Sequence, residues 1–111
     1  MNSDRQMNAR LARLLGWGEV AENTLTKSGL AGYGPGGYFA PVPDWCGDWA
    51  DLMPLACEHQ IDLTHGDQYV WARWGFARYV DQVVSENSAR EVEARRVVVL
   101  ALIEKLGSEN A

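Results

Sequence analysis

One apolar segment near the C-terminus constrains the fold more than any other part of the chain. Residues 97–103, VVVLALI, are apolar at every position. An amphipathic surface helix would leave a polar face there, so a sheet and a further element must cover this segment. Ser88 and Glu91 have capping-box spacing, and Lys105 and Gly107 suit a helix end. We therefore predict a long buried helix over residues 88–107, although the three valines also fit a buried strand.

Composition limits the class of protein. The chain has 111 residues, of which 47% are hydrophobic and 23% charged, so we expect one domain with its own hydrophobic core. No apolar run approaches the roughly 20 residues that span a bilayer. The polar N-terminus lacks the apolar core of a signal peptide, and we expect a cytoplasmic protein with Cys46 and Cys57 as thiols. The net charge of -5 argues against a nonspecific nucleic-acid binder.

Local patterns predict further helices and a small sheet. Ser3 and Gln6 form a capping-box pair, and Asp44 or Asp48 caps a second helix. Expected helices cover residues 3–15 and 44–60, and expected strands cover residues 38–42, 61–64, 68–76 and 78–84. Together these elements predict a single α+β domain over residues 1–111, in which an antiparallel sheet of about three to four strands lies in a helix–sheet–helix sandwich. The tail at residues 108–111 is expected to fray.

The strand over residues 68–76 carries bulky side chains on both faces. Tyr69, Trp71 and Arg73 alternate with Val70, Ala72 and Trp74. This pattern predicts that the strand is covered on both sides, at least in part. Arginine interleaved with tryptophan also resembles a base-stacking platform in composition. Core packing is the preferred interpretation, followed by protein contact and then by nucleic acid.

A glycine-rich segment at about residues 29–43 is predicted as a flexible loop. It lacks the lysine and the serine or threonine of a phosphate-binding loop. Exposed aromatic side chains on a flexible backbone are good contact residues for a protein partner. Five tryptophans are many for this length, and we expect one or two of them at an interface. The predicted partner-binding residues are Tyr33, Tyr38, Phe39, Trp45 and Trp74.

The residue types needed for catalysis or metal binding do not form a convincing set. Cys57, His59, Asp62 and His65 are close in sequence, but structural zinc sites need recognisable ligand pairs. A cysteine–histidine nucleophile would need a third orienting group, for which the sequence has no candidate. We therefore expect no enzyme activity, no metal and no cofactor.

Several segments together resemble known phage families. NARLARLLGW, PDWCGDWADLMPLACEHQIDL and YVWARW, followed by the C-terminal helix, resemble small proteins of the phage ABA-sandwich type and of the phage NinX-like family. The matching residues are Ala50, Asp51, Pro54, Ile61, Leu63, Trp71, Ala72 and the run from Val97. Residues 32–37 have no counterpart. The resemblance implies helix–sheet–helix layering and a phage or prophage origin, and it carries over no catalytic residues.

These observations lead to one main functional prediction. We expect a non-enzymatic phage or prophage accessory protein that binds a host or phage protein in the bacterial cytoplasm. The resemblance adds the expectation that it inhibits a host factor, such as a component of a defence system. The alternative is a homodimeric structural module in which the helix between Val97 and Ile103 pairs two subunits.

Overall fold

The computed structural model describes residues 3–75, 78–83 and 90–109. In chain order the elements are α1 (Asp4–Leu14), β1 (Gly18–Glu22), β2 (Leu30–Tyr33), β3 (Phe39–Pro41), α2 (Trp49–Glu58), β4 (Asp62–His65), β5 (Tyr69–Trp74), β6 (Arg78–Val83) and α3 (Arg90–Glu109). The predicted cap at Ser88 and the last two residues of the predicted tail lie outside the described residues.

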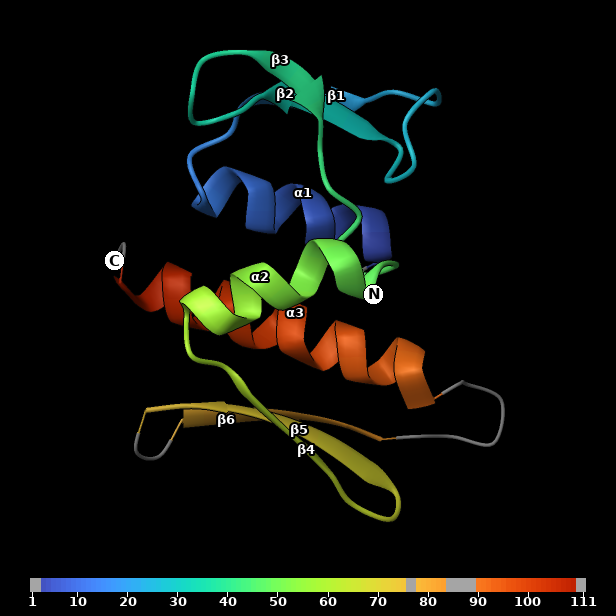
Figure 1. Ribbon diagram of the computed structural model, residues 1–111, viewed down its shortest axis with the longest axis vertical. Coiled ribbons are helices and arrows are strands. Elements are labelled where there is room, and N and C mark those ends of the chain that lie inside the picture. Colours follow the sequence, from blue (N-terminus) through green and yellow to red (C-terminus); the bar gives the residue numbers. More distant parts are fainter. Residues whose placement is uncertain (1–2, 76–77, 84–89, 110–111) are drawn as a thin grey trace.

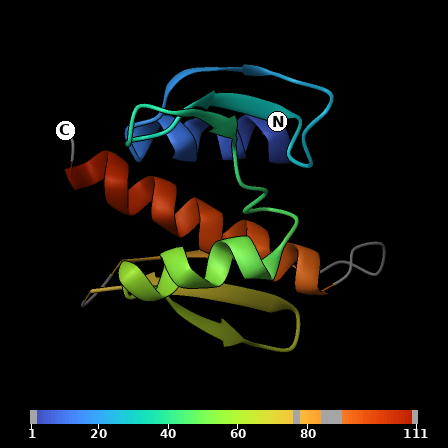
Figure 2. The same cartoon turned by 45° about the horizontal axis from the view of Figure 1, so that its top comes forward.

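Two antiparallel sheets lie at opposite ends of the molecule, with the helices between them (Figure 1). The N-terminal sheet has the strand order β1-β2-β3, and the C-terminal sheet has the order β4-β5-β6. Helix α1 lies next to the N-terminal sheet, and α3 lies next to the C-terminal sheet (Figures 1 and 2). The predicted α+β class, with an antiparallel sheet packed on helices, is confirmed. The layers differ from the expected order, because β1 and β2 add a second sheet and the helices form the centre.

Helix α3 is the central element of the fold. It contacts α1, α2, β5 and β6, so its apolar middle is covered by a sheet and by other helices, as predicted. From Val97 to Ile103 every side chain is buried except Leu100, which is half-buried. The helix continues past Gly107 to Glu109, so the predicted stop at Gly107 is wrong. Gly107 does not adopt the positive φ that would end the helix.

Both ends of α1 are fixed by backbone hydrogen bonds. The Ser3 hydroxyl accepts from the Gln6 N–H, and the Gln6 side chain accepts from the Ser3 N–H, which confirms the capping box. At the other end Gly16 has φ +96°, and the Trp17 N–H donates to the Ala12 carbonyl at 3.0 Å. This is a Schellman ending. It turns the chain sharply from α1 into β1.

Helix α2 begins later than predicted. Its N-cap is Asp48, whose carboxylate accepts from the Ala50 N–H at 2.8 Å. Asp44 belongs instead to the turn before the helix, where its carboxylate accepts from the Gly47 N–H at 3.1 Å. Pro54 lies inside the helix without ending it.

The glycine-rich segment forms a β-hairpin where a loop was predicted. Strands β2 and β3 pair antiparallel, and β3 confirms the short strand predicted at residues 38–42. The Gly34 N–H donates to the Tyr38 carbonyl at 3.0 Å and closes the turn. Glycine is required at position 32 because two strands approach each other closely there, and not because a loop must be flexible. A Cβ there would lie 2.9 Å from the Gly18 carbonyl oxygen, so only glycine lets β1 approach β2 this closely.

The C-terminal sheet matches the three strands predicted from alternation to within two residues at each end. In β5, Val70 and Ala72 are buried, and this strand contacts α3. Tyr69, Trp71 and Arg73 alternate with them and are exposed. In the described part of the chain helices cover one face of this sheet, and Tyr69 and Trp71 on the other face are 41% and 38% exposed. The expected cover on both sides is therefore only partial on the outer face.

Candidate functional site

The β2–β3 hairpin brings three of the predicted contact residues together. Tyr33 and Phe39 are directly paired across the two strands, and their ring centroids are 5.4 Å apart with an interplanar angle of 65°. Tyr38 adjoins them in the turn. The exposed fractions are 43% for Tyr33, 61% for Phe39 and 82% for Tyr38. We call these three residues the aromatic hairpin. So much exposed aromatic surface on one short element is unusual for a group that has only a packing role.

The aromatic hairpin is anchored to the end of α1. A Cβ at Gly34 would lie 3.7 Å from the Trp17 ring, and a Cβ at Gly16 would lie 3.9 Å from the Pro35 ring. Trp17 is half-buried against the core. The same residues that end α1 therefore lie directly under the hairpin turn. This anchoring presents the exposed rings on a defined backbone, which lowers the entropy that a partner must remove on binding.

The two other predicted contact residues do not join the aromatic hairpin. Trp45 is only 4% exposed and belongs to the core, so its assignment as a contact residue is wrong. Trp74 is half-buried at the end of β5 and packs against the core. The sequence could not place Trp45, because an isolated aromatic residue between elements has no readable period. Trp74 shares the period-two face of Val70 and Ala72 in β5, and this alternation is the signal that marked it as inward-facing.

A buried polar network holds Trp45 and its neighbours in place. The Asn8 side chain donates to the Asp44 carboxylate at 3.0 Å and accepts from the Cys46 N–H at 3.1 Å. Arg95 of α3 donates from Nε to the Cys46 carbonyl at 3.0 Å. Asn8 is buried in α1, and its side-chain amide supplies hydrogen-bond partners for the polar groups of the turn at Asp44 and Cys46. Nothing in the hydrophobic pattern of the sequence indicates this network.

Cys46 is a structural thiol. Burial raises its pKa to about 12, and the nearby carboxylates of Asp4 and Asp44 act in the same direction. The thiolate is the nucleophilic form of cysteine, so this side chain is chemically inert at neutral pH. Cys57, in contrast, is exposed on α2.

A second aromatic surface lies on the outer face of the C-terminal sheet. The rings of Tyr69 and Trp71 are stacked, with centroids 6.4 Å apart and an interplanar angle of 5°. Arg73 is exposed on the same face of β5. We call Tyr69 and Trp71 the β5 aromatic pair. The period-two alternation of β5 places Tyr69 and Trp71 on one face of the strand. Because the side chains on both faces are bulky, the sequence predicted cover on both faces and not an exposed aromatic surface.

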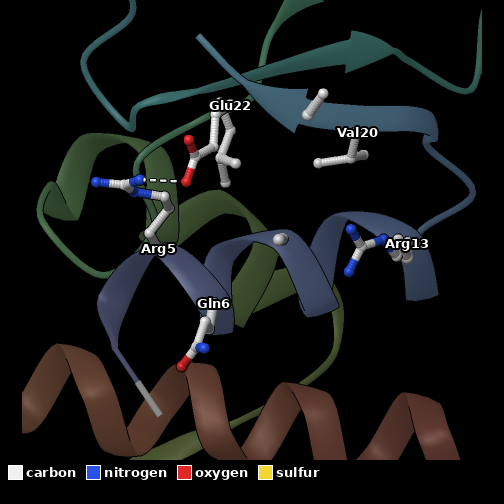
Figure 3. A pocket seen from close by; sticks show the side chains of 8 residues that line it. Arg5, Gln6, Arg13, Val20 and Glu22 are labelled. Atoms are coloured by element: carbon white, nitrogen blue, oxygen red, sulfur yellow. Dashed lines mark hydrogen bonds and ion pairs between the residues drawn. The ribbon is translucent and has the colours of Figure 1, made fainter. Parts of the chain in front are cut away.

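A groove separates α1 from β1 (Figure 3). Its volume is about 310 Å³, and it is lined by Arg5, Gln6, Ala9, Arg13, Val20, Ala21, Glu22 and Leu30. Arg5 Nη1 donates to Glu22 Oε1 at 2.6 Å and bridges the helix and the strand. A second hollow of about 560 Å³ adjoins it and reaches Arg96, whose Nε donates to Asp4 Oδ1 at 2.8 Å. Sequence analysis did not identify this groove, because its residues come from α1, β1 and β2, and neither β1 nor β2 was predicted.

Two further observations concern the described residues only. No group of three or more histidine, cysteine, aspartate or glutamate side chains in this part of the chain could hold a metal ion. No helix within it is long and apolar enough to cross a membrane.

Comparison with known proteins gives no match: no family model, no curated protein and no solved structure is similar to the chain.

Proposed function

We propose that this chain is a non-enzymatic module that binds another protein through the aromatic hairpin. The observation that carries the proposal is the exposure of Tyr33, Tyr38 and Phe39 on one anchored hairpin, in which the rings of Tyr33 and Phe39 are in contact. Tyrosine and other aromatic residues bury large areas on association and lose little side-chain entropy. A partner that covered these rings would remove their apolar surface from water, and this burial would favour binding.

The biological setting of the proposal comes from the resemblance to small phage proteins. We infer a phage or prophage accessory protein that acts in the bacterial cytoplasm and inhibits a host factor, such as a component of a defence system. The net charge of -5 supports a partner with a basic contact surface, because opposite charges speed association and favour the correct partner.

The homodimer alternative is less well supported than protein binding through the hairpin. It assigned the contact to the helix between Val97 and Ile103, but this run is buried within one chain. A subunit contact through it would require the C-terminal sheet or the other helices to separate from α3.

The experiment compares two aromatic surfaces of the same chain. The tagged protein is used to capture partners from the lysate of a bacterial host, and the retained proteins are identified by mass spectrometry. The test variant is Tyr38→Ala with Phe39→Ala, and the matched control is Tyr69→Ala with Trp71→Ala. Both variants remove two exposed rings, so their effects on solubility and on nonspecific adhesion are comparable.

We expect one dominant host protein that the wild-type chain and the control variant retain and the hairpin variant loses. Its affinity, measured with the purified partner, should fall at least about tenfold, since aromatic contact residues often contribute more than 1.4 kcal/mol. Equal retention by both variants would contradict the assignment of the contact to the hairpin.

A further inference from the structure

Strand β1 is an open edge of the N-terminal sheet. It pairs with β2 on one side, and within the described residues no element pairs with its other side. Each of its five residues is exposed or half-buried. Near its end the pairing is regular, with Ala21 opposite Ala31 and Glu22 opposite Leu30. The backbone groups on the outer edge of a strand are a template for an added strand.

The groove between α1 and β1 lies directly beneath this edge (Figure 3). Its wall includes small or apolar side chains from three elements, namely Ala9 of α1, Val20 of β1 and Leu30 of β2. Arg5 and Arg13 of α1 also line it, eight residues apart, which corresponds to about 12 Å along the helix. An extended segment of about four residues has the same length.

The two arginines that line the groove differ in their salt bridges. Glu22 is engaged by Arg5 at one end. Arg13 lies in the last turn of α1, and its guanidinium lies beneath Val20 (Figure 3). In the described part of the chain, no carboxylate forms a salt bridge with Arg13. Its donors are therefore available to a carboxylate, with which a guanidinium makes short, charge-assisted hydrogen bonds.

We propose that β1 and the groove beneath it bind an extended segment of a protein partner by strand addition. The backbone of the segment pairs with the open edge of β1. Its alternate side chains enter the groove, where small apolar groups contact Val20 and a carboxylate binds Arg13. The proposal adds a second contact to the proposed protein-binding function, but it uses a surface separate from the aromatic hairpin.

The probe is a fluorescein-labelled heptapeptide, glycine–valine–serine–glutamate–serine–valine–glycine, in which the valines and the glutamate alternate with serine and therefore share one face of the strand. Binding to the full chain is measured by fluorescence anisotropy. We expect saturable binding that weakens about tenfold when glutamate is replaced by glutamine, because one charge-assisted contact is lost. Arg13→Gln should weaken binding of the glutamate peptide to a similar extent.

Arg10→Gln is the matched control, since Arg10 is an exposed arginine of the same helix that does not line the groove. It removes the same charge and should change the dissociation constant less than twofold. Equal weakening by Arg10→Gln and Arg13→Gln would overturn the proposal, because it would indicate nonspecific charge attraction. Failure of the peptide to bind at millimolar concentration would also overturn it.

Backbone methylation separates strand addition from a simple charge contact. In a strand, only every second N–H points to the same neighbouring strand. One peptide is therefore methylated at the glutamate nitrogen, and another is methylated at both serine nitrogens. Strand addition requires one of them to lose at least about tenfold in affinity while the other stays within about threefold of the parent. Equal behaviour of the two peptides would overturn the proposal.

Because the aromatic hairpin is not involved, the variant Tyr38→Ala with Phe39→Ala should bind the peptide as the wild-type chain does. This result distinguishes the two proposals. Peptide binding can fail while the hairpin still captures a protein partner, and the hairpin can fail while the peptide still binds.

Discussion

At the scale of single residues, Gln60 holds a backbone conformation that favours glycine. It follows α2 with φ +56°, its N–H donates to the Cys57 carbonyl at 3.2 Å, and the Ile61 N–H donates to the Ala56 carbonyl at 3.0 Å. This is the same Schellman ending that Gly16 provides for α1. A side chain with a Cβ costs about 1 kcal/mol in this conformation.

Gln60→Gly should therefore raise the free energy of unfolding. We expect a gain of about 0.5–1 kcal/mol, because the relief of strain exceeds the added flexibility of the unfolded chain. Urea unfolding followed by circular dichroism measures it. Gln60→Ala is the control, since it retains the Cβ and should leave the midpoint nearly unchanged. A midpoint for Gln60→Gly at or below that of Gln60→Ala would contradict the argument.

The titration of Asp48 makes the stability of the fold at the start of α2 depend on pH. Its pKa is lowered, first by the side-chain hydrogen bond from Lys27 and second by the Ala50 N–H. Lys27 also lies 3.3 Å from Asp51, and its own pKa is raised, chiefly by Asp48. A carboxyl whose pKa is lower in the folded chain stabilises the fold above its unfolded pKa. That contribution is lost as the pH falls through the folded pKa.

The free energy of unfolding of the wild-type chain should therefore fall as the pH decreases below about 4. In Asp48→Asn the cap is retained, because asparagine also caps helices, but this titration is removed. We expect a smaller decrease between pH 5 and pH 3 in the variant, measured by urea unfolding at each pH. Parallel pH profiles for the two proteins would show that the Lys27–Asp48 pair contributes nothing measurable.

At the scale of elements, the approach of β1 to β2 depends on Gly32. A Cβ at this position would lie 2.9 Å from the Gly18 carbonyl oxygen and 3.1 Å from the Val20 Cα. Both are backbone atoms, which cannot move aside as a flexible side chain does. Gly32→Ala should cost about 1–3 kcal/mol of stability, as overpacking in a tight site does.

Gly18→Ala is the matched control for Gly32→Ala. Gly18 pairs with Tyr33 at the other end of the same strand pair, and a Cβ there would meet no atom within 4 Å. We expect this change to be neutral or slightly stabilising, because it reduces the freedom of the unfolded chain. Equal destabilisation by both changes in thermal unfolding would show that alanine is unfavourable anywhere in this hairpin.

Helix α1 and strand β5 show which sequence signals were readable, because each has one buried face. Ser3 with Gln6 marked the start of α1, and the alternation around Val70 marked β5. Strand β1 has no buried side chain, so no hydrophobic period could mark it. Gly32 was interpreted as part of a loop because glycine marks both turns and close approaches, and the two cannot be separated without the neighbouring strand.

The same reasoning explains how much of the candidate surfaces could be predicted. The exposed rings of Tyr38 and Phe39 followed from their glycine-rich surroundings. Trp45 could not be assigned, because its turn packs on a distant part of the chain: the N–H of the next residue, Cys46, donates to Asn8 of α1. The groove beneath β1 depends on how α1 and β1 lie in space, which no local pattern contains.

At the scale of the whole molecule, α3 joins the two sheets into one structure. It contacts the C-terminal sheet directly and the N-terminal sheet through α1, which contacts both α3 and β1. Among the described residues, no helix lies on the outer face of either sheet (Figures 1 and 2). If α3 separated, the C-terminal sheet would lose the cover of its inner face, and α1, which packs on the N-terminal sheet, would lose its contact with the rest of the molecule. We therefore expect the chain to unfold as one cooperative unit.

Leu102→Ala tests this dependence, because the Leu102 side chain is fully buried in α3. The cavity should lower the free energy of unfolding by about 2–5 kcal/mol. Native-state hydrogen exchange, followed by mass spectrometry of proteolytic peptides, then reports each sheet separately. Protection should fall by the same factor in peptides containing β2 and in peptides containing β5, since both strands exchange through global unfolding. Loss of protection in β5 alone would show that the N-terminal sheet and α1 remain folded without α3.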